Sequence, residues 1–209
     1  MTFARPRIEG TGRIEAFSDG VIAIIVTLLI FEVRLPEVPP HATSADFWAA
    51  LVSIAPKFGS FALSFGAVAI YWVNHHHFFS GITHTDWKLL WLNNLLLFFL
   101  SIVPFTTAVL GDHLDQPIAI ALYALDLGLA AAAFTLMGWY VLFVGRLVDE
   151  AVPAAVRRTE FRRSLIGTAI YLVCVPIAFV WPVVALALFV VIPITYVVPS
   201  LFSRAADAI

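Results

Sequence analysis

Charged residues and cysteine are scarce in this sequence. Only 12% of the 209 residues are Asp, Glu, Lys or Arg, and the single cysteine, Cys174, lies in an apolar run. One cysteine cannot form an internal disulfide, and here it completes no metal or redox motif. The basic residues are dispersed along the chain, so we expect no nucleic-acid partner. The sequence also lacks a nucleophile elbow, a phosphate-binding glycine loop and a pair of hydrolytic carboxylates, which argues against an enzyme.

Apolar sequence is what the chain has in abundance. Hydrophobic residues make up 61% of it and the mean hydropathy is +0.95, whereas a soluble domain is about half apolar and about a quarter charged. The apolar runs are long enough to cross a bilayer. The sequence therefore predicts an all-α membrane protein that forms a single domain over residues 1–209 within the lipid bilayer. The first apolar segment carries Asp19 and Glu32 and lacks a small-residue cleavage site, so we do not expect a cleavable signal peptide.

Six apolar segments of membrane-spanning length follow one another along the chain. Pro36 ends the first of them, and Trp181-Pro182 divides the last apolar block into two, because proline cannot continue a helix. Lys57, near the start of the second segment, is expected to extend toward the membrane surface. A polar stretch over 146–163 separates the fourth segment from the fifth. We predict transmembrane helices at residues 13–34, 47–77, 86–110, 116–145, 164–181 and 183–203.

The distribution of basic residues predicts the orientation of these six helices. An even number of spans places both termini on the same side of the membrane. Lysine and arginine are enriched in cytoplasmic loops. The opposite side carries only Arg34, with Lys57 inside the second span. We therefore predict cytoplasmic N- and C-termini, on the side that carries Arg5, Arg7, Arg13, Lys88, Arg146, Arg157, Arg158, Arg162, Arg163 and Arg204.

Polar residues gather near the cytoplasmic ends of the first three predicted helices. An ionisable side chain within a membrane helix is costly unless a partner satisfies it. We interpret this cluster as a structural network that holds the three helices together; the alternative is a proton or ion relay. The predicted network contains Arg13, Phe17, Ser18, Asp19, Trp72, His75, His76, His77, Asn93 and Asn94.

The run of three histidines also raises the question of a metal site. His75 and His76 point in different directions on a helix, so further ligands would have to converge on either of them. Of the other histidines, His41 and His113 are predicted on the far side of the membrane, which leaves His84. We therefore expect no metal.

The first predicted helix has an apolar stripe with a single hydroxyl. At about 100° per residue, Gly20, Ile24, Thr27, Leu28 and Phe31 share one face. Asp19 lies about 140° from Ile24, so the acid and the stripe have different neighbours. Packing against other helices is the common role of such a face. The residues alone do not decide between this packing role and a functional role for the stripe.

Five short motifs in the first half of the chain form a recognisable set: Arg13-x-x-x-Phe17-Ser18-Asp19, Ser64-Phe65, Trp72-x-x-His75-His76, Asp86 with Asn93-Asn94, and Pro104-Phe105-Thr106-Thr107. This set resembles the transmembrane protein 175 family, the endolysosomal potassium channels and their prokaryotic relatives. The resemblance covers roughly residues 13–110. The last three predicted helices are similar to the family only in length and hydrophobicity.

The resemblance implies a potassium-permeable, modestly selective cation channel without a cofactor, K⁺ being the permeant ion. It implies a single-repeat prokaryotic member in the cell membrane, assembled as a homotetramer around a central pore that the first helix lines. Carried onto this sequence, the hydrophobic constriction falls on Ile24, a polar layer on Thr27, and further apolar layers on Leu28 and Phe31. Phe31 departs from the family, in which an aliphatic residue is more usual. No Thr-Val-Gly-Tyr-Gly filter loop occurs, as the resemblance implies.

Two other functions compete with the channel. A proton-coupled secondary transporter would use Asp19 and the His75–His77 cluster, but such proteins carry internal repeats and helices broken at mid-membrane. We find no half-to-half repeat, and the first predicted helix contains no proline. A structural or assembly factor of the membrane, in which the polar network is purely architectural, is the third possibility.

Overall fold

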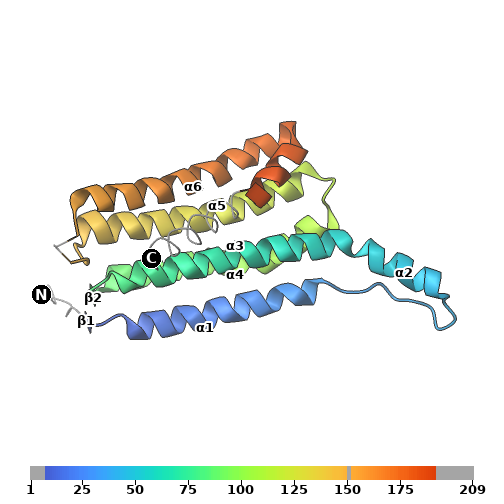
Figure 1. Ribbon diagram of the computed structural model, residues 1–209, viewed down its shortest axis with the longest axis horizontal. Helices are drawn as coiled ribbons and strands as arrows, with labels where there is room; N and C mark the ends of the chain where they lie inside the picture. The colour runs from blue at the N-terminus through green and yellow to red at the C-terminus, as the bar shows by residue number, and fades with distance from the viewer. Residues whose placement is uncertain (1–7, 150–151, 192–209) are drawn as a thin grey trace, which may run out of the picture.

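The computed structural model describes residues 8–149 and 152–191, and long helices lying side by side dominate it (Figure 1). Within these residues, five helical stretches are long and apolar enough to cross a membrane. The chain is therefore an all-α membrane protein, as predicted. The long helices are α1 (Gly12–Leu28), α3 (Ala55–Ser80), α4 (Trp87–Asp112), α5 (Pro117–Trp139) and α6 (Ala154–Val180).

The second predicted span, 47–77, consists of two helices. The first, α2 (Ser44–Ser53), projects beyond the bundle in Figure 1. A capping box starts it: the Thr43 hydroxyl accepts from the backbone N–H of Asp46, and the Asp46 carboxylate accepts from the N–H of Thr43. The chain then restarts as α3, with Pro56 in its first turn. Proline fits there because the first-turn N–H groups have no partner within the helix.

The other helices differ from the predicted spans mainly at their ends. After α1, the chain continues as a 3₁₀ turn, Leu29–Glu32, and α5 continues as a π-helical turn, Tyr140–Val144. The helix α6 begins at Ala154 rather than at 164, so the basic part of the expected polar stretch is helical. A shorter apolar helix, Pro182–Val191, occupies the start of the predicted span 183–203, whose remainder lies outside the described residues.

Backbone pairing fastens the loops at the end of the bundle where α1 and α4 begin (Figure 1). Strand β1 (Ile8–Glu9) pairs in antiparallel fashion with β2 (His84–Thr85), the segment just before α4. Ile82 forms an isolated bridge with Val148, which follows α5. The starts of α1 and α4 and the end of α5 are therefore held together by main-chain contacts.

The helices α4 and α5 form the centre of the bundle. α4 contacts α1, α3 and α5, and α5 contacts α6 on its other side. Two glycines allow close approach. A Cβ on Gly128 of α5 would lie 2.8 Å from Cδ2 of Leu172 in α6, and one on Gly111 of α4 would lie 2.6 Å from Oγ of Ser60 and 3.1 Å from Cα of Lys57 in α3. Small residues at such positions let membrane helices pack backbone to backbone.

We predict that Gly111→Ala destabilises the protein, because the added methyl group meets the α3 backbone and not only a flexible side chain. Overpacking of this kind costs about 1–3 kcal/mol. The matched control is Gly59→Ala in α3, whose added Cβ would have no atom within 4 Å. Thermal unfolding in detergent should show a lower Tm for Gly111→Ala than for Gly59→Ala. Equal transitions for the two variants would mean that the close approach at Gly111 is not required.

Candidate functional site

One face of α1 is left uncovered by the other helices that the structure describes. Ile24 is 60% exposed, Leu28 45% and Phe31 63%, although all three are large and apolar. Thr27 on the same face is also exposed. The opposite face packs against α3 and α4 through Ile14, Ser18, Ile22, Ile25 and Leu29, which are buried. We call Gly20, Ile24, Thr27, Leu28 and Phe31 the α1 stripe.

The α1 stripe carries one hydroxyl, at Thr27. Its Oγ1 donates to the carbonyl oxygen of Ile24 at 2.8 Å. The hydroxyl proton is thereby used within the helix, while the oxygen keeps lone pairs that can accept from water or coordinate a cation. Thr27 is thus an acceptor set among apolar neighbours on an exposed face.

The 3₁₀ turn after α1 changes the direction of Phe31. In a 3₁₀ helix, side chains at i and i+3 lie one above the other. Leu28 precedes this turn and Phe31 lies within it, so the Phe31 ring extends the line of Leu28 instead of drifting around the helix. The stripe expected from a regular helix thus continues to Phe31.

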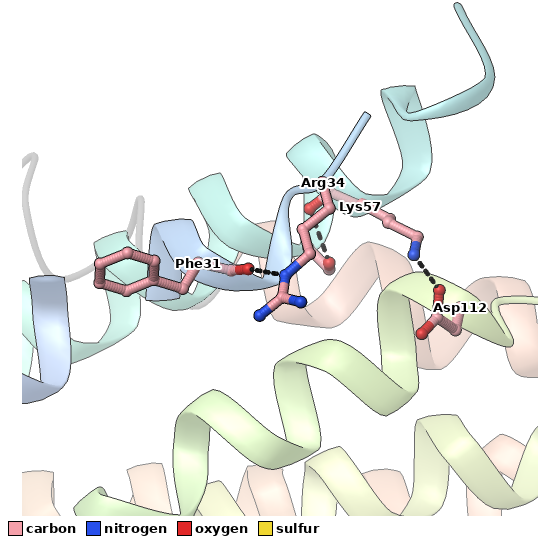
Figure 2. Close-up of polar contacts among 5 residues, drawn as sticks. Phe31, Arg34, Lys57 and Asp112 are labelled. Atoms are coloured by element: carbon pink, nitrogen blue, oxygen red, sulfur yellow. Dashed lines mark hydrogen bonds and ion pairs between the residues drawn. The ribbon is translucent and has the colours of Figure 1, made fainter. Parts of the chain in front are cut away.

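Polar contacts hold the end of the bundle near Phe31 (Figure 2). The Nε of Arg34 donates to the carbonyl oxygen of Phe31 at 3.0 Å, which satisfies an acceptor left open where the helix ends. Nζ of Lys57 lies 2.5 Å from Oδ1 of Asp112 and joins the start of α3 to the end of α4. Lys57, expected to extend toward the membrane surface, forms this ion pair at the end of the bundle, with both side chains partly exposed.

A chain of hydrogen bonds connects α1, α4 and α3 at the opposite end. Nδ2 of Asn93 donates to Oγ of Ser18 at 2.9 Å, and Oδ1 of Asn93 lies 2.9 Å from Nε2 of His75. An amide oxygen only accepts, so Nε2 of His75 carries the proton. All three side chains are buried. We call Ser18, His75 and Asn93 the polar clamp.

A second contact lies beside the polar clamp, nearer the surface. Nε1 of Trp72 donates to Oδ1 of Asp19 at 2.9 Å, and the His76 ring stacks on the Trp72 ring with centroids 6.1 Å apart. Asp19 therefore points toward α3 and away from Ile24, as its helical position predicts. Asp19 and Trp72 are both exposed, so this contact lies at the edge of the bundle.

Four other residues of the predicted network lie outside the polar clamp. Arg13, Phe17, His77 and Asn94 are exposed, and within the described residues none of them hydrogen-bonds to the polar clamp. Successive residues on a helix point about 100° apart. Asn94 therefore cannot share the direction of Asn93, and His77 cannot share that of His75.

A second group of buried polar side chains lies in the interior of the bundle and was not predicted from the sequence. Oγ1 of Thr106 donates to Oδ2 of Asp126 at 2.8 Å, while Oδ1 of Asp126 has no hydrogen-bond partner among the described residues. Close by, the Ser64 hydroxyl lies between those of Thr107 and Tyr123, at 2.7 and 3.0 Å. Asp126 could have indicated this group, because an acidic residue within an apolar span needs polar partners.

No group of three His, Cys, Asp or Glu side chains that could hold a metal ion occurs in residues 8–149 and 152–191. The histidines at 75 to 77 diverge around α3, and the buried one is engaged by Asn93. The geometry of the site is therefore that of an exposed apolar stripe positioned by a buried polar clamp.

Comparison with known proteins identifies the family. The family model described as "Endosomal/lysosomal potassium channel TMEM175" matches residues 13–104. A potassium channel of Streptomyces collinus is 36% identical over 174 residues, which cover 81% of this chain and 83% of the relative. A potassium channel of a Chryseobacterium species is 31% identical over 192 residues, which cover 90% and 93% of the two chains.

A solved structure agrees with this assignment. The crystal structure of a lysosomal potassium-selective channel TMEM175 homolog from Chamaesiphon minutus matches with a TM-score of 0.79 at 30% identity, and the match covers 90% of this chain and 97% of that one. Its fold therefore corresponds to the helical bundle described above. The chain belongs to the TMEM175 family of ion channels.

Proposed function

We propose that this chain is a potassium-permeable, modestly selective cation channel, in which four copies surround a central pore lined by the α1 stripe. The observation that carries the proposal is the exposure of Ile24, Leu28 and Phe31, which no helix within residues 8–149 and 152–191 covers. Potassium is proposed as the permeant ion because the bacterial relatives, which are of similar length, are named potassium channels. The chain has one Phe17-Ser18-Asp19 motif, which fits the single-repeat form that assembles as a homotetramer.

Small residues on α1 support a helical neighbour for its exposed face. Ala16, Gly20 and Ala23 are exposed, and a Cβ on Gly20 would have no atom within 4 Å. Small residues spaced by about one turn allow membrane helices to approach closely, whereas lipid makes no such demand. We therefore infer that copies of α1 come together in the assembled channel.

Rings of Ile24 and Leu28 would then form an apolar constriction, which extends to Phe31 over about 10 Å of helix. A narrow apolar ring empties of water, and this closes the path to ions without a physical plug. Widening the ring restores water and with it conduction. In this proposal, the diameter of the apolar ring determines whether the channel is closed or open.

Selectivity in such a pore is modest, because the walls offer few oxygens. An ion must shed part of its hydration shell at the constriction, and K⁺ holds its water less tightly than Na⁺. The Thr27 hydroxyls provide four oxygens as partial replacements. They favour the ion that sheds water more readily.

We further infer that both termini are cytoplasmic in a prokaryotic cell membrane. Arg13 and Lys88 lie in the first turns of α1 and α4, and Arg146 follows α5. These ends and the basic start of α6 lie together at one end of the bundle (Figure 1). The opposite end has Arg34 and Lys57, and Lys57 is neutralised by Asp112. This distribution agrees with the positive-inside rule.

The test of the proposed function is reconstitution of the purified protein into a planar bilayer with mixed K⁺ and Na⁺. Unitary currents that reverse toward the K⁺ potential support a channel. Saturable uptake that depends on a proton gradient, without such currents, would establish instead the transporter based on Asp19 and the histidines. Silent bilayers containing a folded oligomer would point to a structural role.

We predict that Ile24→Asn raises the open probability by an order of magnitude or so, because a polar ring keeps water in the constriction. Ile24→Leu retains the apolar surface and serves as the control. Single-channel recording measures both variants. A folded Ile24→Asn oligomer whose open probability equals or falls below that of the wild type contradicts the assignment of the gate.

We predict that Thr27→Val lowers the K⁺/Na⁺ permeability ratio roughly twofold or more, since each lost oxygen contact is worth about 0.5 kcal/mol or more. Valine has nearly the shape of threonine, and Thr27→Ser keeps the hydroxyl as a control. Reversal potentials under bi-ionic conditions report the ratio. Identical reversal potentials for Thr27→Val and wild type would remove Thr27 from the permeation path.

A further inference from the structure

A groove of about 320 Å³ runs between α4 and α5, near the end of the bundle where α4 begins. Its walls are aromatic and aliphatic: Trp87, Trp91 and Leu92 from α4, with Leu136 and Trp139 from α5. The three tryptophans are exposed. Tryptophan is enriched where a membrane helix meets the water interface, because its ring is apolar and its N–H is polar. The groove therefore lies at the depth of lipid headgroups and upper acyl chains.

Tyr140 also lines this groove, and two contacts fix its position. Its hydroxyl donates to Oδ2 of Asp86, the residue that caps α4. The following loop packs against its ring, since a Cβ on Gly145 would lie 3.0 Å from a ring carbon. The groove is thus a preformed feature and not a gap between loosely packed side chains.

Lys88 supplies a positive charge to the lining of the groove. Its Nζ lies 5.8 Å from the centroid of the Tyr140 ring, in cation–π range. No carboxylate of the described residues lies within ion-pair distance of Lys88. The nearby Asp86 carboxylate is engaged on both oxygens, by the backbone N–H of Leu89 and by the Tyr140 hydroxyl. The Lys88 ammonium is therefore available to an anion.

We propose that the groove binds one anionic phospholipid, with an acyl chain along the tryptophan walls and the phosphate headgroup at Lys88. The apolar walls require a chain, which inorganic phosphate lacks. The uncompensated ammonium favours a net negative headgroup over a zwitterionic one, because a basic residue near the membrane surface is worth roughly a fivefold preference for anionic lipid.

Quenching of tryptophan fluorescence by brominated lipids tests this proposal on the full-length protein in bilayers. Brominated phosphatidylglycerol and brominated phosphatidylcholine are compared, and the part of the quenching lost in Trp139→Phe is assigned to the groove. We expect a roughly fivefold preference for the anionic lipid at this site. Equal quenching by the two lipids overturns the proposal. Absence of quenching at Trp139 by either lipid also overturns it, and indicates that a second copy of the chain covers the groove.

Charge variants distinguish the effect of Lys88 on lipid preference from the effect of the other basic residues at this end of the molecule. Lys88→Gln should bring the preference close to one, while Lys88→Arg should retain it. The matched control is Arg162→Gln, an exposed cation on α6 outside the groove. A preference that survives Lys88→Gln, or that falls as much in Arg162→Gln, overturns the assignment of the headgroup to Lys88.

Discussion

The Asn93 amide fixes the rotation of α1, and the exposed face of that helix depends on it. Hydrocarbon offers no hydrogen bonds, so a buried amide must find its partners within the protein. Asn93 finds them in Ser18 of α1 and His75 of α3. With Ser18 turned toward Asn93, the helical period places Ile22 and Ile25 in the core and Ile24 and Leu28 outside. A polar contact at one end of the helix thus decides which apolar residues are left for another chain to meet.

The same requirement organises the interior of the bundle. Hydroxyl groups pair with one another across helices, as Ser64 does with Thr107 and Tyr123, and α4 and α5 are joined by the contact of Thr106 with Asp126. Between these polar groups the contacts are apolar, and glycines let the backbones approach. Polar pairs therefore set the register and rotation of the helices, while close packing supplies the contact area.

Hydrophobic run length was sufficient to predict the long apolar helices but not all of their ends, and helical period predicted that Ile24, Leu28 and Phe31 share one face of α1, because both are properties of single helices. The sequence also carries signals for the two helix starts in the second span: Thr43 and Asp46 cap α2, and Pro56 lies in the first turn of α3. Membership of the polar clamp was predicted less well. A cluster in sequence spreads around a helix, so Asn93 is buried while Asn94 is exposed. The groove between α4 and α5 could not be predicted, since it joins Lys88 to Tyr140, residues distant in the chain.

The 3₁₀ turn after α1 has a mechanical consequence. Its residues rise about 2.0 Å each, against about 1.5 Å in an α-helix, and advance by about 120° instead of about 100°. Rewinding Leu29–Glu32 into α-helix would shorten the segment by about 2 Å and turn Phe31 sideways by about 60°. The carbonyl contact from Arg34 would have to be remade at the new pitch. Whether this single turn is 3₁₀ or α-helical therefore determines the position of Phe31, the bulkiest side chain of the α1 stripe.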